Sequence, residues 1–329
     1  MAGHGRDGWL RRQVLFAFLN SLLGHKTRPG LTGIGIHADG VCVAQVFYKD
    51  GRRPLLSAFD FHPWPEGESQ DKTLARIATD YGLKRAVCTT VLDQTEYSLL
   101  LTEAPDVPAE ELRAAMRWRV KDLIDFHIND ATLDVFDIPG ERVVGRARPM
   151  YTVAARSAVI QKRVDQLDAA GINLQVIDII ELAQRNLATL LPEDVRGVAL
   201  LSFTAGAGLL TITKQSELYL SRNLDIGLDA LTQSENPSDY FDRIVLEIQR
   251  SLDYYDSHFR QPPLAGLVLT PMSRPVPGLE EHLRANLSMN VSIMDLTQLM
   301  DFRSEFDPAA RARCLITIAA ALRREQATL

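Results

Sequence analysis

The sequence contains no apolar run that approaches the roughly 20 residues a helix needs to cross a bilayer. Its N-terminal stretch also lacks the small-residue cleavage site that follows the apolar part of a secretory signal peptide. These two absences predict that the body of the protein stays in the cytoplasm.

Cysteine is scarce, and the chain has three such residues: Cys42, Cys88 and Cys314. Their neighbours are apolar, and none has the close second cysteine that a zinc site or a redox dithiol requires. We therefore predict that all three are buried small hydrophobic side chains, as expected in a reducing compartment.

Motifs of common catalytic sites are absent as well. The seven histidines are dispersed, with no His-Glu-x-x-His spacing, so the sequence predicts no metal site. There is no Gly-x-Ser-x-Gly elbow to suggest a serine hydrolase. The net charge of -6, from 42 acidic and 36 basic residues, argues against a general nucleic-acid binder.

What the chain does have is enough apolar material for a large core, since 46% of its 329 residues are hydrophobic. Domains typically hold about 100–200 residues, so this length predicts roughly two lobes. Strand and helix periodicities alternate along the body, which predicts an α/β fold. Strand patterns occur at 31–61, 85–91, 97–101, 151–156, 173–180, 198–220, 267–270 and 291–294.

Two helices have clear start signals. Pro108 suits a first helical position, and the following carboxylates suit the positive end of the helix dipole. This helix should run to Ile124 with its apolar face toward the core: Leu112, Met116, Val120, Leu123 and Ile124. Near the C-terminus, Asp307 and Pro308 predict the cap of one final helix that carries Leu315, Ile318 and Leu322.

An amphipathic helix with basic flanks is predicted at residues 8–23, followed by a linker to about residue 30. Two interpretations fit it. Such a helix can dock on the body or fray as a tail, or it can lie on an anionic membrane surface as a peripheral contact.

Five segments together resemble the actin-like pilus-assembly family PilM, and most closely its branch MshI, which serves mannose-sensitive pili. Three are strand–turn segments, Gly33–Val46, Val198–Ile212 and Leu267–Leu279. The other two are the helical stretches Glu110–Asp130 and Glu247–Tyr255. Family members usually carry a proline where Asp125 stands, so the turn after the first helix differs here.

The resemblance implies an actin-like, ribonuclease H-like α/β fold with two lobes and a small α/β insert subdomain. Residues 1–30 would form the N-terminal helix and linker. The first lobe would comprise residues 31–196, including the insert at roughly 60–150. Residues 197–329 would form the second lobe and the C-terminal helix.

The nucleotide cleft that such a fold usually contains is degenerate in this sequence. An actin-like ATPase needs glycine turns that approach the phosphates and carboxylates that hold hydrated magnesium. Against the family's first phosphate turn, Gly35 stands in place of the acid and His37 in place of the glycine. Ser202 replaces the acid of the second turn, and Thr270 begins a third segment without the family's glycines.

The residues that would line this degenerate cleft are His37, Ala38, Asp39, Gly40, Thr204, Ala205 and Gly206. We predict no catalytic residue and no bound cofactor. The alternative is a nucleotide switch or weak ATPase that binds ATP with magnesium, in which Asp39 substitutes for the missing acids.

The resemblance further implies a non-catalytic scaffold on the cytoplasmic side of an inner-membrane pilus assembly platform. Its partner would be the cytoplasmic segment of a bitopic membrane protein similar to PilN, with Arg117 and Arg119 as candidate contacts. A pilus motor ATPase is a further candidate partner, and no nucleic acid is expected. A second alternative is the cytoplasmic component of a type II secretion platform, a class that has a related fold.

Overall fold

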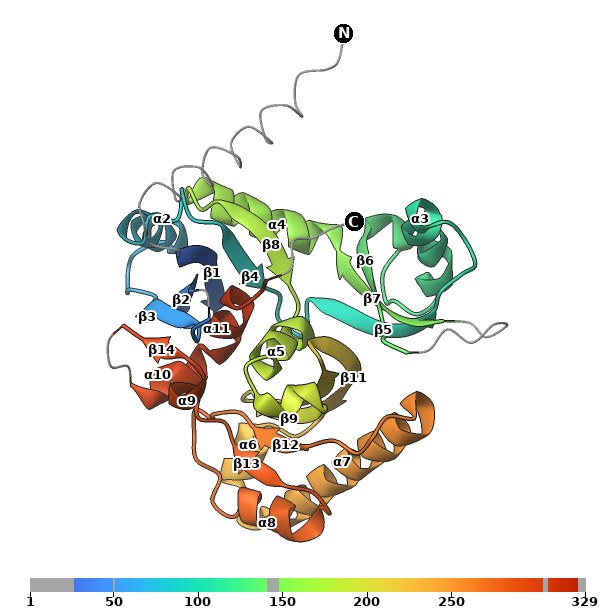
Figure 1. The fold of residues 1–329 in the computed structure, drawn as a ribbon. Coiled ribbons are helices and arrows are strands. Elements are labelled where there is room, and N and C mark those ends of the chain that lie inside the picture. Colours follow the sequence, from blue (N-terminus) through green and yellow to red (C-terminus); the bar gives the residue numbers. More distant parts are fainter. Residues whose placement is uncertain (1–26, 50, 141–147, 304–306, 325–329) are drawn as a thin grey trace.

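The computed structural model describes residues 27–49, 51–140, 148–303 and 307–324. The amphipathic helix predicted at residues 8–23 lies outside these residues. Within them, no helix has both the length and the apolar character needed to cross a membrane. The described residues form three β-sheets with helices packed around them (Figure 1).

The first sheet has the strand order β14-β3-β2-β1-β4-β8. Strands β1, β2 and β3 form an antiparallel meander, and β4 and β8 then run parallel to β1. Alternate residues of β2 face opposite sides, so that Val41 and Val43 pack with helix α2 while Cys42 and Ala44 pack with helix α5. The strands are β1 (Thr27–His37), β2 (Gly40–Lys49), β3 (Leu55–Pro63), β4 (Cys88–Val91), β8 (Leu174–Asp178) and β14 (Asp301–Phe302), and the helices are α2 (Gln70–Asp80), α4 (Ser157–Ala169) and α5 (Ile180–Ala188).

The second sheet repeats this arrangement, with the order β11-β10-β9-β12-β13. Again three antiparallel strands precede two parallel ones. Its outer face packs against helices α7 and α8 in a separate hydrophobic cluster. The elements are η2 (Pro192–Val195), β9 (Val198–Phe203), β10 (Gly208–Lys214), β11 (Glu217–Leu224), α6 (Leu228–Gln233), α7 (Ser238–Phe259), β12 (Gly266–Leu269), α8 (Leu279–Asn286) and β13 (Val291–Ile293).

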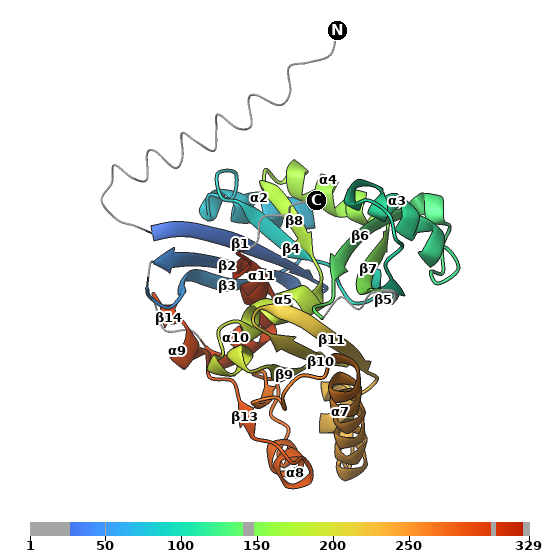
Figure 2. The ribbon, with the colours of Figure 1, turned by 45° about the vertical axis from the view of Figure 1, so that its right-hand side comes forward.

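The third sheet, with the order β5-β7-β6, forms the small insert beside the first lobe (Figures 1 and 2). Helix α3 covers one of its faces. This helix ends at Val120, and the predicted core residue Leu123 is 57% exposed because it lies in the following turn. The elements are β5 (Tyr97–Glu103), α3 (Ala109–Val120), η1 (Ile128–Asp130), β6 (Ala131–Asp137) and β7 (Pro149–Arg156).

After the second sheet the chain returns to the first one. Strand β14 pairs in parallel with β3, and helix α11 packs on the inner face of the first sheet. The predicted cap is confirmed, because the Asp307 carboxylate accepts a hydrogen bond from the amide of Ala310 (3.1 Å). The prediction of one final helix is wrong, because the backbone at Cys314 leaves the helical conformation. The segment comprises α9 (Leu296–Leu299), β14, α10 (Pro308–Arg313) and α11 (Leu315–Ala321).

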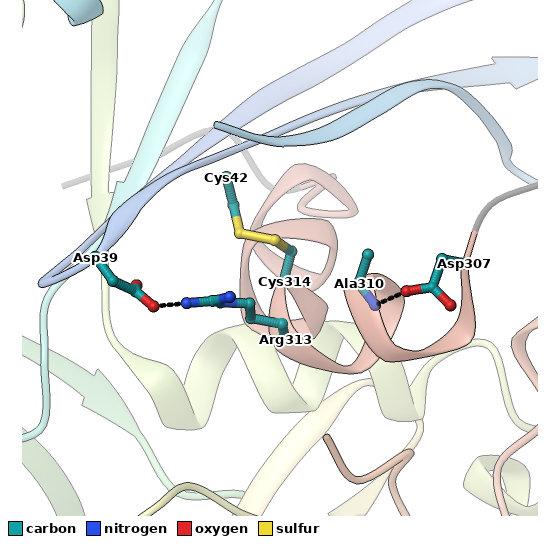
Figure 3. The surroundings of a disulfide bond; sticks show 6 residues. All are labelled: Asp39, Cys42, Asp307, Ala310, Arg313 and Cys314. Carbon is teal, nitrogen blue, oxygen red and sulfur yellow. Dashed lines mark hydrogen bonds and ion pairs between the residues drawn. A yellow bond between two sulfur atoms is a disulfide. The ribbon is translucent and has the colours of Figure 1, made fainter. Parts of the chain in front are cut away.

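A disulfide at this break corrects the prediction for the cysteines. Cys42 on β2 is bonded to Cys314, and their Cα atoms lie 5.7 Å apart (Figure 3). All three cysteines are buried, as predicted, but Cys88 alone is free. The pair was invisible in the sequence because 272 positions separate its members.

One continuous hydrophobic cluster joins the two lobes. It contains Cys42, Ala44 and Phe59 from the first sheet and Leu200 and Val268 from the second. Helices α5 and α11 lie between the sheets and contribute to the same cluster (Figures 1 and 2). The lobes therefore share a packed core.

Candidate functional site

The turn between β1 and β2 holds the first group of predicted cleft residues. Ala38 and Asp39 are exposed at its tip, and His37 pairs with Gly40 across it. Asp39 forms an ion pair with Arg313 at the end of α10 (Figure 3). The Arg313 guanidinium also lies over the ring of Phe61, 3.8 Å from its centroid. The one carboxylate expected to replace the missing acids is thus bound by a cation of the same chain.

Helix α11 also fills the space beside the glycines of β1. A Cβ atom on Gly33 would collide with the backbone carbonyl of Thr317, and a Cβ atom on Gly35 would collide with the Thr317 hydroxyl. The Gly35 atom would in addition lie 3.0 Å from Nε2 of His37. Glycine at these two positions leaves room for helix α11. Gly35 therefore has a packing role of its own, besides standing where the family has an acid.

His37 is half-buried behind the turn. Its carbonyl accepts a hydrogen bond from the indole of Trp64 (3.0 Å), whereas Nε2 has no partner among the described residues. Burial lowers the pKa of His37 below its ordinary value of 6.5, and Arg313 and Arg163 lower it further, against the opposing charge of Asp93. The imidazole is therefore neutral at physiological pH.

Ser202, which replaces the acid of the second turn, belongs to a buried hydrogen-bond network. Its hydroxyl donates to the side-chain oxygen of Gln184 on α5 (2.6 Å). The amide nitrogen of Gln184 donates to the carbonyl of Leu200 (2.8 Å) and to the hydroxyl of Thr211 (3.0 Å). This network ties α5 to two strands of the second sheet.

The second predicted turn, with Thr204, Ala205 and Gly206, packs against the start of α6. The amides of Leu228 and Asp229 donate to the carbonyls of Thr204 and Ala205, both at 2.9 Å. A Cβ atom on Gly227 would collide with this turn. The first amides of α6, which would otherwise be available to an anion, are therefore used inside the protein.

A second C-terminal arginine binds the buried carboxylate at the end of β8. Arg323 donates to Asp178 at 2.8 Å, and their side chains are 13% and 1% exposed. The Asp178 carboxylate also accepts from the amide of Ile179 (2.9 Å). Thr270 is buried too, and its amide donates to Leu201 (2.9 Å).

These contacts do not fit a bound magnesium–nucleotide complex. Magnesium needs accessible oxygen ligands, but Asp39, the one carboxylate at these turns expected to replace the missing acids, is paired with Arg313. No group of three His, Cys, Asp or Glu side chains that could hold a metal ion occurs in the part of the chain that the structure describes. The sequence located the turns, but it gave no signal for Arg313, Thr317 or Arg323.

The two arginines predicted to bind a partner differ in their contacts. Arg117 donates to the carbonyls of Ala131 (3.2 Å) and Ile128, so it ties α3 to the start of β6. Arg119 is 46% exposed and makes a loose ion pair with Glu103 (3.9 Å). Arg119 therefore remains accessible to a partner, whereas Arg117 holds the insert together.

Trp118, between these arginines, was not predicted to contribute. It is 74% exposed, the largest exposed fraction among the exposed large hydrophobic side chains of the described residues. Lys121 lies over its ring at 5.9 Å, and Leu101 and Leu123 are also exposed in the insert. A tryptophan on the polar side of a helix was the available signal, because tryptophan is enriched where proteins bind one another.

Comparisons with known proteins agree with this architecture. Residues 102–237 match the family described as "Type IV pilus assembly protein PilM". A chain of the PilM-PilN type IV pilus biogenesis complex superposes with a TM-score of 0.68 and 19% identity, covering 89% of this chain and 98% of that one. A search of curated proteins gives no match.

Two more distant structures are also similar. The cytoplasmic domain of EpsL, an inner-membrane component of the type II secretion system of Vibrio cholerae, has a TM-score of 0.48 and 13% identity, with 90% and 96% of the chains covered. A protein with an actin-like ATPase fold from Bacteroides thetaiotaomicron has a TM-score of 0.46 and 8% identity, and the match covers 83% of this chain and 92% of that one. The chain thus has an actin-like fold and contains a PilM-like segment that includes most of the insert.

Proposed function

We propose that this protein is a non-catalytic scaffold of a type IV pilus assembly platform, of the mannose-sensitive type. It would act on the cytoplasmic side of the inner membrane and bind the cytoplasmic segment of a PilN-like membrane protein. A pilus motor ATPase would be a further partner. The observation that carries the proposal is the PilM-like match at residues 102–237, which includes α3 and the exposed Trp118.

The contacts at the two turns support a role without nucleotide hydrolysis. Arg313 binds Asp39, and Thr317 packs against Gly33 and Gly35. A nucleotide switch would require these contacts to open. The hydrophobic cluster shared by both lobes also opposes the lobe movement that such a switch uses.

The insert is held rigidly enough to present a binding surface. The hydroxyl oxygen of Tyr151 on β7 accepts a hydrogen bond from the amide of Ser221 on β11 (3.1 Å). Ile138 and Tyr151 also pack against Leu218 of the second lobe. Trp118 and Arg119 therefore project from a fixed platform, which lowers the entropy cost of binding.

The test is titration calorimetry with peptides from the cytoplasmic N-terminal segments of bitopic membrane proteins encoded beside this chain. We expect saturable binding of one such peptide. Trp118→Ala should weaken it at least about tenfold, because exposed tryptophans are frequent hot spots. Leu246→Ala, at an exposed apolar residue of the second lobe, is the matched control and should not change the affinity.

Two results would refute the proposal. One is the absence of binding to any of these peptides by folded protein. The other is an equal loss of affinity in both variants, because a loss at Leu246 would point to a general effect on the protein. Thermal unfolding of each variant would show that both remain folded.

A further inference from the structure

The break between α10 and α11 does not follow from the residues around it. Sharp breaks in a helix usually occur at proline, at glycine or where an inserted group disturbs the hydrogen-bond ladder. Residues 309–321 contain neither glycine nor proline, and six of them are alanine, which favours the helix most strongly. The break does coincide with the bond that joins Cys314 to Cys42 of β2 (Figure 3). Attachment to the first sheet is therefore the feature that accounts for the break.

Helix α10 is held to the first lobe less firmly than α11. Of the α10 side chains that the structure describes, none is buried, although Ala310 packs against the hydrophobic cluster shared by the lobes. Arg313 reaches the first sheet through its ion pair with Asp39 and its contact with the ring of Phe61. Loss of a further attachment would affect α10 more than α11. Helix α11 has six buried side chains: Leu315, Thr317, Ile318, Ala319, Ala320 and Ala321.

The disulfide is shielded from a reductant while α10 is in place. Cys42 and Cys314 are 0% and 1% exposed, so a reductant reaches their bond only after a local opening. Segments with few buried contacts open locally at a low free energy. Because α10 ends next to Cys314, lifting this helix is such an opening. Cys88 is not an internal reductant, because it packs on the α2 side of the first sheet, whereas Cys42 faces α5.

We propose that the Cys42–Cys314 bond is a redox switch, which holds α10 against the β1–β2 turn when it is formed and releases α10 when it is reduced. A dithiol reductant attacks one of the two sulfurs and forms a mixed disulfide, which its second thiol then resolves. Two electrons and two protons pass to the protein, which leaves the thiols of Cys42 and Cys314 and the oxidised reductant. A small-molecule disulfide, such as oxidised glutathione, re-forms the bond by the reverse exchange.

The released state differs from the structure at the β1–β2 turn. Arg313 moves away with α10, so that Asp39 loses its ion pair and the ring of Phe61 loses its cover. Helix α11 stays in place, because its attachment depends on its buried side chains. The switch therefore changes the accessibility of one turn without separating the lobes.

The cytoplasmic location proposed above favours a redox role over a purely structural one. In reducing compartments, disulfides are usually transient and serve catalysis or redox sensing. The redox role thus rests on the proposed function, whereas the attachment of α10 by the bond does not.

The test is limited trypsin digestion of the folded chain before and after incubation with dithiothreitol. Trypsin cleaves a segment only when it opens, so cleavage after Arg311 and Arg313 reports the release of α10. We expect reduction to raise this cleavage rate at least about tenfold, because a disulfide commonly stabilises by more than a tenfold shift requires. In the reduced protein, cleavage after Arg250 on α7 should remain at least about tenfold slower than at α10, because the body stays folded.

Two variants accompany this measurement. Cys42→Ser with Cys314→Ser should be cleaved like the reduced protein, with or without dithiothreitol. Cys88→Ser removes the free thiol and leaves the bond intact, so it is the matched control and should respond to dithiothreitol as the original chain does.

Three results would overturn the proposal. One is a bond that dithiothreitol leaves intact in the folded chain, as a count of alkylated thiols would show. Another is cleavage of α10 at the same rate before and after reduction. The third is cleavage after Arg250 as fast as at α10 in the reduced protein, because reduction would then unfold the whole chain. Peptide binding to the insert is measured separately, so the scaffold proposal can fail or stand independently of these outcomes.

Discussion

Arg117 and Arg119 are close in sequence but have different environments. Arg117 donates to two backbone carbonyls, and a charged donor of this kind contributes about 1.5–3 kcal/mol. We expect Arg117→Ala to lower the free energy of unfolding by about 2 kcal/mol in urea titrations. Arg119→Ala removes an exposed ion pair, so it should change the free energy by less than about 0.5 kcal/mol. Equal effects of the two substitutions would show that the Arg117 contacts do not stabilise the insert.

The disulfide can be tested by counting the free thiols of the chain. Protein unfolded without a reductant should react with iodoacetamide at one thiol, that of Cys88, because Cys42 and Cys314 are bonded to each other. After reduction, three thiols should react, as the mass of the alkylated chain will show. A Cys88→Ser variant is the control. It should have no reactive thiol before reduction and two after it. Three reactive thiols before reduction would rule out the disulfide.

His37 should make the stability depend on pH. Burial lowers its pKa in the folded protein below the ordinary value of 6.5. Below about pH 6.5 the unfolded chain therefore binds more protons at this site, so the free energy of unfolding falls as the pH decreases. Above that pH both states are neutral, and the site has no effect.

The corresponding variant is His37→Gln. We expect its urea-unfolding free energy to depend less on pH between about 5 and 6.5 than that of the original chain. His258→Gln, at an exposed residue of α7, is the control for replacing a histidine by glutamine. Identical profiles for His37→Gln and the original chain would contradict the assignment.

Helix α11 and strand β1 are packed so closely that glycine is required at two positions. Gly35→Ala should destabilise the protein by about 1–3 kcal/mol, because its Cβ meets the Thr317 hydroxyl. Thr317→Ala removes that hydroxyl, so the double variant should recover much of the loss. Gly33→Ala meets the Thr317 backbone carbonyl, which no substitution at 317 removes. A double-mutant cycle in urea would measure the difference.

Two outcomes would contradict this account of the α11 contact. One is a Gly35→Ala variant as stable as the original chain. The other is equal recovery by Thr317→Ala in the Gly33 and Gly35 backgrounds, because the two contacts would then not differ as the structure indicates.

Elements that depend on local pattern were predictable from the sequence, whereas contacts between distant segments were not. The strand patterns of the two main sheets and the start of α3 follow from periodicity and capping. The early end of α3 does not, because the apolar pattern continues to Ile124 after the helix has ended at Val120. The break at Cys314 is also absent from the pattern, because it coincides with a bond to a residue 272 positions away.

The same distinction holds for the candidate site. The positions of His37, Asp39 and Thr204 at turns could be predicted from the resemblance. The partner of Asp39 could not, since Arg313 lies near the other end of the chain. Single-sequence spacing carries no information on such pairs, and they decide whether a carboxylate at this site is available to a metal.

At the scale of the whole molecule, the C-terminal segment joins the two lobes. It pairs with the first sheet through β14, and its helix α11 packs between the two sheets. The side-chain amide of Asn186 on α5 donates a hydrogen bond to the carbonyl of Ala319 on α11 (3.2 Å). Gln184, also on α5, is bonded to the second sheet. A movement of one lobe against the other would break these contacts together, which is unfavourable for a hinge.

The remaining prediction concerns nucleotide binding. We expect a fluorescent ATP analogue with magnesium to show no saturable binding that unlabelled ATP competes away, up to millimolar nucleotide. The physical reason is that Arg313 binds Asp39, the one carboxylate expected to replace the missing acids, and that the amides of α6 are used by the Thr204–Gly206 turn. Arg313→Ala, which frees Asp39, is the informative variant. If the original chain binds competitively and Asp39→Ala abolishes this binding, the protein is a nucleotide switch whose C-terminal segment opens. If neither the original chain nor Arg313→Ala binds, the loss of the phosphate-turn residues is sufficient, and the scaffold proposal stands without a nucleotide.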